Sequence, residues 1–206
     1  LFDVAARRRI PISGGYFPNP WSVGDIRWED DSSRFTFLYN QRGHQVLRVL
    51  AVDAETGACR ILVEERARTF IDYAYKRFCH FTPSGEIVWM SERDGWNHLY
   101  LYDARTGHVR NAITRGEWMV RSVEHVDDDA RQVWFMASGV HEGQDPYYLH
   151  LCRVGFDGDG FTVLTEENGT HVVDFSPDRR LFVDTWSRVD AAPTSDLRRS
   201  EDGSVG

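Results

Sequence analysis

Residues 98–107 read His-Leu-Tyr-Leu-Tyr-Asp-Ala-Arg-Thr-Gly, a run of apolar and aromatic residues that ends in a glycine turn. A similar run occupies residues 49–57, and a looser copy occupies residues 148–158. The closing glycines of the three runs are 50 and 51 residues apart. Glycine accepts the positive φ that tight hairpins require. The runs therefore predict a repeated β-hairpin, with about fifty residues in each unit.

A second landmark repeats with the same period. An apolar residue leads into a polar turn and then into a hydrophobic strand, and this happens four times, at residues 28–31, 81–84, 126–129 and 175–178. In the second unit, the pattern predicts four strands at residues 69–75, 87–91, 98–102 and 109–113. No stretch shows sustained helical periodicity. Four short strands that return every ~40–50 residues are typical of propeller blades.

The sequence thus predicts an all-β fold, a β-propeller segment of about three and a half four-stranded blades. The expected divisions are a lead-in from a preceding blade and four blades, the last one partial: 1–24, 25–68, 69–118, 119–166 and 167–206. Because three and a half blades would leave open sheet edges, we expect the chain to be a segment of a longer one. A four-bladed closure, with residues 1–24 supplying the missing strand, is the alternative.

Composition narrows the range of partners. A formal charge of −8 disfavours nucleic acid and anionic membranes, both of which attract basic surfaces. No apolar run approaches the ~20 residues that span a bilayer. The first residue is Leu1 and no leader-like segment follows it, so the sequence leaves secretion open.

The sequence predicts no metal and no cofactor. Cys59, Cys79 and Cys152 form no Cys-x-x-Cys pair and are expected to be buried thiols whose redox state stays open. Residues 157–160 read Asp-Gly-Asp-Gly, but Phe161 interrupts the ligand pattern of a calcium loop, so a hairpin turn is expected. Residues 127–129, three aspartates, are likewise expected to form a solvated turn.

No catalytic residue is predicted in this chain. A nucleophile elbow needs Gly-x-Ser-x-Gly, and the nearest runs, around Ser22 and Ser204, lack the first glycine. The tryptophans recur at related places in the units, and packing between blades explains them better than a ligand-stacking shelf does: Trp89, Trp96, Trp118, Trp134 and Trp186.

Several stretches resemble the propeller of bacterial dipeptidyl-peptidase IV-like enzymes, serine peptidases of the prolyl-oligopeptidase class (S9). The most specific is Ser-Glu-Arg-Asp-Gly-Trp-Asn-His at residues 91–98, and the others are residues 81–85, 113–118, 137–139, 143–148, 175–178 and 184–188. The resemblance covers roughly residues 17–206. The Phe-Ser-Pro-Asp run at 175–178 is less specific, since TolB-like propellers share it.

The resemblance implies an eight-bladed propeller, of which this chain is the later half, that caps an α/β-hydrolase domain. That domain would carry the Ser-Asp-His triad and cut dipeptides from free N-termini. The propeller itself would be non-catalytic and would gate and position peptide substrates. The expected partners are the hydrolase domain of the same chain and peptide substrates, together with a homodimer of the whole protein. Periplasmic or extracellular localisation is implied by the same resemblance.

Only some of the residues that contact the substrate in the family have candidates in this sequence. A pair of glutamates binds the substrate's ammonium group in the family, but residues 64–65 and 166–167 lack that motif's context and are expected to be solvated turns. The candidate substrate-facing residues are Tyr75 and Arg77, which lie near a family position where an aromatic-Arg pair faces the pocket.

Two other functions compete with the peptidase propeller. A TolB-like or WD-like module that binds proteins without enzymatic activity would need only the repeated turns. A sugar-cleaving propeller would need inward carboxylate pairs ~5–9 Å apart, and no such pairs recur at central strand positions.

Overall fold

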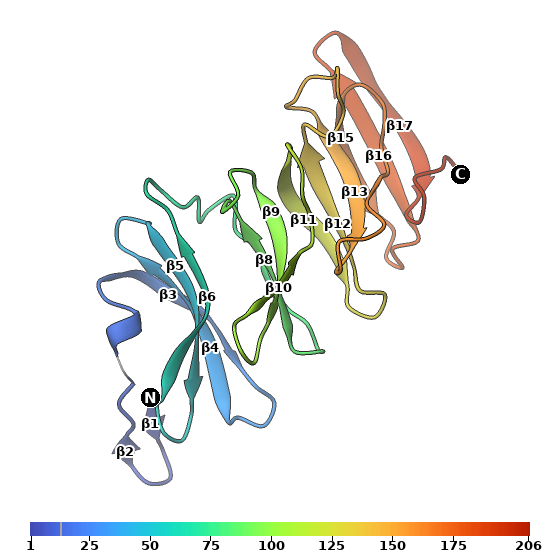
Figure 1. Cartoon of the computed structure of the whole chain (residues 1–206). Helices are drawn as coiled ribbons and strands as arrows, with labels where there is room; N and C mark the ends of the chain where they lie inside the picture. The colour runs from blue at the N-terminus through green and yellow to red at the C-terminus, as the bar shows by residue number, and fades with distance from the viewer. Residues whose placement is uncertain (13) are drawn as a thin grey trace. The chain divides into compact units, whose positions relative to one another are not determined.

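The computed structural model describes residues 1–12 and 14–206, which form strands joined by turns (Figure 1). The chain divides into two compact units, residues 1–77 with 102–108 and residues 78–101 with 109–206. Among the described residues, no helix has the length and hydropathy of a membrane span.

The first unit is built on one four-stranded antiparallel sheet. Its strands are β3 (Pro20–Trp28), β4 (Arg34–Gln41), β5 (Val46–Asp53) and β6 (Cys59–Arg66), paired in that order. A short hairpin, β1 (Phe2–Asp3) and β2 (Arg8–Arg9), and a single 3₁₀ turn, η1 (Gly14–Tyr16), precede it. The first sheet thus begins at Pro20 rather than at residue 25.

The second unit holds three more antiparallel sheets, each paired in chain order. The second sheet contains β7 (Cys79–Phe81), β8 (Glu86–Ser91), β9 (His98–Asp103) and β10 (Val109–Ala112), with the end of β9 grouped with the first unit. The third contains β11 (Met119–Asp127), β12 (Gln132–Ser138), β13 (Leu149–Gly155) and β14 (Thr162–Val163). The fourth contains β15 (Thr170–Phe175), β16 (Leu181–Arg188) and β17 (Ala191–Arg199).

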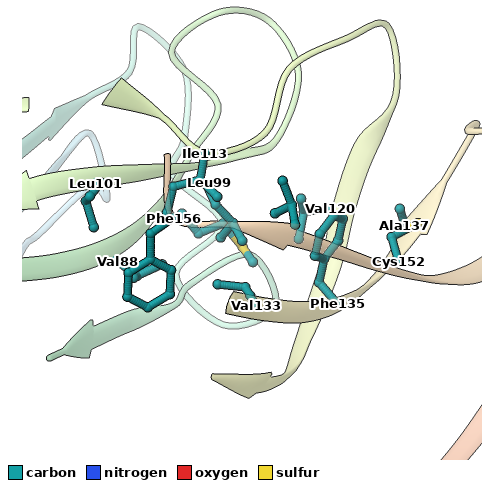
Figure 2. Packing of buried hydrophobic residues seen from close by; sticks show 12 residues of the cluster. Val88, Leu99, Leu101, Ile113, Val120, Val133, Phe135, Ala137, Cys152 and Phe156 are labelled. Carbon is teal, nitrogen blue, oxygen red and sulfur yellow. The ribbon is translucent and has the colours of Figure 1, made fainter. Parts of the chain in front are cut away.

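Strand β12 has both faces buried, and its alternate side chains enter two different cores. Val133 and Phe135 pack with residues of the second sheet, in the core drawn in Figure 2. Trp134 and Met136 pack in the opposite direction, with Phe182 of the fourth sheet. Successive strand residues point to opposite faces, so the third sheet lies between two neighbours. This face-to-face stacking of one sheet after another is the packing of consecutive propeller blades and differs from a two-layer sandwich.

The periodic glycines of the sequence lie where one sheet touches the preceding one. Gly107, at the turn after β9, has a φ of 78°, and a Cβ there would lie 2.8 Å from the carbonyl oxygen of Leu62 in β6. Gly203, after β17, has a φ of 74° and the same relation to Leu164. The turn therefore needs glycine for its backbone conformation and for its close approach. Gly158 likewise lies against the Ala112 carbonyl of β10, whereas Gly57 lies against Pro11, which precedes the first four-stranded sheet.

One predicted strand is wrong. Residues 69–75 form a connection without strand structure, and the first strand of the second sheet is Cys79–Phe81. The backbone there makes turn hydrogen bonds, because the carboxylate of Asp72 accepts one from the Tyr75 amide at 3.1 Å and the Lys76 amide bonds to the Asp72 carbonyl. The other three strands predicted for this unit coincide with β8, β9 and β10.

Candidate functional site

Four rings from three separate segments of the first unit meet at one end of its sheet. His44, in the β4–β5 turn, lies at their centre, with its ring stacked on Tyr73 at 4.4 Å between centroids. Its edge-to-face neighbours are Trp21 at 5.3 Å and Phe70 at 5.4 Å. The guanidinium of Arg42 lies 5.3 Å from the Trp21 ring. Trp21, His44, Phe70 and Tyr73 are called the aromatic cluster below.

Backbone hydrogen bonds fix the connection at residues 67–78 against the β4–β5 turn. The amide of Ile71 donates to the carbonyl of His44 at 2.8 Å, and the amide of Ala67 donates to that of Gln45. The side chain of Gln45 donates to the Arg68 carbonyl at 2.8 Å. His44 itself has a φ of 55°, a conformation that side-chain-bearing residues seldom adopt. These hydrogen bonds therefore fix the positions of the segments that carry the aromatic cluster.

The two candidate residues of the sequence lie on this same connection. Tyr75 is 85% exposed, which leaves most of its ring open to a ligand. The guanidinium of Arg77 forms an ion pair with Asp25 in β3, so its charge is already partly neutralised. Both residues remain predicted substrate contacts.

Half-exposed aromatic rings make this end of the sheet suited to binding apolar and cationic groups. Trp21 and Phe70 are 51% and 53% exposed, although rings of their size are usually more buried. Such rings can pack on apolar side chains, and the face of an aromatic ring can attract a cation, as the face of Trp21 attracts the Arg42 guanidinium. These residues could not be recognised as a group from the sequence, because they are far apart along the chain and no local motif joins them.

One of the two glutamate pairs is not a solvated turn, which corrects the prediction. Glu64 and Glu65 lie within β6, and Glu64 accepts a hydrogen bond from Arg48 of β5 at 2.5 Å. Glu166 is exposed in the stretch before β15, whereas Glu167 is partly buried and pairs with Arg198. Arg48 and Arg198 therefore neutralise the Glu64 and Glu167 carboxylates.

Three side chains beside and within the fourth sheet have the residue types of a metal site, the buried His171 and Asp184 and the partly buried Glu167. Its positive charge already comes from Arg198, which lies 3.1 Å from Asp184 and also contacts Glu167. Both ring nitrogens of His171 are engaged, Nδ1 with Asp184 at 2.8 Å and Nε2 with the Glu167 carbonyl oxygen at 3.0 Å. The geometry fits an ion-pair network that ties β15, β16 and β17 together better than it fits metal ligands.

The remaining chemical groups have structural surroundings. Burial raises the pKa of the Cys152 thiol and, less strongly, that of Cys59, and the three cysteines are free thiols. Residues 128–130 form a turn with Asp129 exposed, and the Asp128 carboxylate in it lies 3.0 Å from Nε2 of His80. Residues 157–160 do form a turn, with Gly158 at a φ of 91°.

Two of the tryptophans have the predicted role of packing between sheets. Trp118, which precedes β11 of the third sheet, packs edge-to-face on His98 of the second at 5.0 Å between centroids, and Trp134 donates its indole hydrogen to the Ser200 carbonyl of the next sheet at 3.2 Å. Trp96 is instead 39% exposed.

The family model and the known sequences that match this chain point to the same family. The family described as "Dipeptidyl peptidase IV (DPP IV) N-terminal region" matches residues 2–193. Dipeptidyl peptidase 4 of Arthroderma otae is 31% identical over 175 residues, which is 81% of this chain and 22% of that protein. Dipeptidyl peptidase 4 of Trichophyton rubrum is 24% identical over 173 residues, with the same coverage. The chain thus spans about a fifth of the length of these relatives.

Solved structures agree in fold. A dipeptidyl peptidase 4 of Porphyromonas gingivalis superposes with a TM-score of 0.73 at 21% identity, covering 97% of this chain and 27% of that one. A putative dipeptidyl aminopeptidase IV of Bacteroides ovatus gives 0.71 at 19% identity, covering 99% and 31%. The fold of this chain therefore matches a segment of propeller in both structures.

Proposed function

This chain belongs to the dipeptidyl peptidase IV N-terminal region family, and we propose that it is a propeller segment that admits short peptides and positions them for a hydrolase domain of the same protein. Its contribution to catalysis would be proximity and orientation, because a substrate held at a fixed place reacts as if at high effective concentration. The nucleophile would come from the hydrolase domain.

The aromatic cluster is the observation that carries this proposal. Its rings lie where β3 begins, where β4 turns into β5 and where the chain leaves β6, which is the same end of the sheet. The exposed ring of Tyr75 extends this surface. A binding surface built on connections and held by a rigid sheet is the usual arrangement in binding and catalytic proteins.

The chemistry of the cluster suits a short peptide. Flat aromatic faces pack well on proline and aliphatic side chains, and they attract the positive charge of a free N-terminus. The guanidinium of Arg42 beside Trp21 offers a donor for a peptide carbonyl. On the strength of the family, we also propose the hydrolase domain of the same protein and peptides with free N-termini as partners, and the periplasm or the cell exterior as the location.

The test is steady-state kinetics of the intact protein on a Gly-Pro chromogenic substrate and on a longer peptide with the same N-terminus. Phe70→Ala and Tyr73→Ala should raise KM for the longer peptide by about five- to tenfold, since each removes roughly 1 kcal/mol of ring contact. The value of kcat should stay within about twofold, because the loss is in binding.

Phe2→Ala is the matched control, since Phe2 is an exposed aromatic residue of the same unit, at 57% against 53% for Phe70, outside the cluster. It should leave both constants unchanged. If the cluster variants had the same KM as the unmodified protein, the cluster would have no part in peptide binding.

A further inference from the structure

A groove between the third and fourth sheets, both in the second unit, gathers four arginines. Its volume is about 650 Å³, and its lining includes Arg153, Arg179, Arg180 and Arg199 over the indole of Trp134. The four arginines and Trp134 are called the arginine groove. The volume is in the range of small-molecule sites.

The walls of the groove are joined by hydrogen bonds. The indole nitrogen of Trp134 donates to the carbonyl of Ser200 at 3.2 Å, and the Ser200 amide donates to the Arg180 carbonyl at 2.9 Å. These bonds link β12, the β15–β16 turn and the turn after β17. The guanidinium of Arg153 lies over the Trp134 ring, 5.9 Å from its centroid, so the groove offers a positive charge next to an aromatic ring.

At the junction between the second and third sheets, arginines in a comparable place bind a carboxylate of the protein itself. Between the second and third sheets, the carboxylate of Glu86 accepts hydrogen bonds from Arg131 at 2.5 Å and from Arg110 at 2.6 Å. The Glu86 side chain is only 1% exposed. One buried carboxylate therefore neutralises two converging guanidinium groups.

Strand register shows that this carboxylate is absent from the equivalent place in the groove. Phe81 pairs with Ile87 in the second sheet, and Val126 pairs with Val133 in the third. Glu86 and Gln132 immediately precede those partners, so neutral Gln132 stands in the position of Glu86. By the same register, Arg180 of the fourth sheet corresponds to Arg131 of the third, since Phe175 pairs with Phe182.

The groove consequently carries an excess of positive charge. Its lining also includes two acidic residues, Asp178 and Glu201, against the four arginines, and Asp178 is 4.0 Å from Arg180. Arg179 adopts a φ of 59°, an unfavourable conformation for a residue with a side chain. Burial and, second, the charge of Arg179 lower the pKa of nearby His125. This accumulation occurs in a chain whose formal charge is −8.

We propose that the arginine groove binds a small multivalent oxyanion, whose phosphate or carboxylate oxygens take the place that the Glu86 carboxylate has at the preceding junction. Guanidinium groups bind both kinds of oxyanion through paired hydrogen bonds. The groove is formed where strand one turns into strand two and where strand three ends. The aromatic cluster is formed at the other strand ends, so this site is independent of the proposed peptide contact.

The test is isothermal titration calorimetry of the intact protein at fixed ionic strength, with pyrophosphate in one series and citrate in the other. Saturable binding of one anion per chain is expected, and the tighter of the two identifies phosphate or carboxylate as the preferred chemistry. Arg153→Gln combined with Arg199→Gln should weaken binding at least about tenfold, because two charge-assisted contacts are lost.

Two further variants separate a specific site from general attraction. Arg121→Gln removes an exposed arginine of β11 outside the groove and should leave the affinity unchanged. Gln132→Glu restores an internal carboxylate, and it should weaken anion binding at least about tenfold while raising the melting temperature. Absence of saturable binding, an equal loss in Arg121→Gln, or unchanged affinity in Gln132→Glu would each overturn the proposal.

Discussion

Gly203 lies against the backbone of Leu164, so closely that an added Cβ would be 2.3 Å from the Leu164 carbonyl oxygen. Leu164 follows the last strand of the third sheet, and Gly203 follows β17 of the fourth. The contact joins one sheet to the next at the repeating position of the sequence. The glycine at this position of the repeat therefore has a physical cause, which is the need for a side-chain-free turn where the two sheets meet.

Gly203→Ala should accordingly lower the free energy of unfolding by more than the cost of placing alanine at a positive φ. Loss of positive-φ freedom costs about 1 kcal/mol, and the clash with Leu164 adds at least a similar amount. Gly143→Ala is the matched control, since Gly143 has a φ of 83° and no atom within 4 Å of an added Cβ. Urea unfolding of both variants measures the difference. Equal losses would show that the close approach contributes nothing.

Glu86→Gln should lower the free energy of unfolding by about 1–3 kcal/mol. The hydrogen bond from Arg131 is the main cause that lowers the pKa of the Glu86 carboxyl. A lowered folded pKa contributes stability above the unfolded value of about 4.3 that is lost as the pH falls. Chemical denaturation at pH 7 and pH 3 should therefore show a smaller difference between variant and unmodified protein at pH 3. Glu117→Gln, at an exposed position, should change stability by less than about 0.5 kcal/mol at either pH.

His150 should make the second unit sensitive to mild acid. Burial lowers its pKa to about 4, with further lowering from His171 and His141 and an opposing effect of Asp184. A histidine in the unfolded chain titrates near 6.5. The stability that the folded protein gains by holding His150 neutral is therefore present at pH 7 and is lost as the pH falls from about 6.5 to about 4. His150→Gln, which keeps a donor for the Thr165 carbonyl, should flatten the stability profile over this window. Parallel profiles of the two proteins would contradict the assignment.

The two candidate residues from the sequence should behave differently. Tyr75→Ala should raise KM for a longer peptide several-fold, because the ring is exposed and available. Arg77→Gln should have a smaller effect on KM, since the guanidinium is paired with Asp25. Peptide kinetics of the intact protein measure both. A larger effect of Arg77→Gln would mean that this arginine leaves Asp25 to contact the substrate.

The sequence predicted the β-propeller class, the period and most strands because these depend on local patterns. The run around Leu99 carries its own alternation, and Gly107 marks its turn. The connection before β7 was misread as a strand, since its apolar residues, such as Phe70, serve the aromatic cluster rather than a sheet. The Gly203 turn was not recognised as a repeat, because the strand before it is largely polar.

The candidate site was predictable only in part. Resemblance singled out Tyr75 and Arg77, which lie on the same connection as Phe70 and Tyr73, but the other rings come from segments that meet only after the sheet has formed. The arginine groove depends on strand register between sheets, which shows Gln132 in the position of Glu86. Sequence spacing does not reveal that relation, because the two turns differ in length.

The central claim is that the sheet end bearing the aromatic cluster faces a bound peptide, and photo-crosslinking tests it most directly. A benzophenone amino acid would replace Tyr75 in the intact protein, with Phe2 as the control position, and a short peptide with a free N-terminus would be bound before irradiation. The account predicts a peptide adduct from position 75 that excess unlabelled peptide abolishes, and none from position 2. Equal labelling at both positions, or no adduct from position 75, would contradict it.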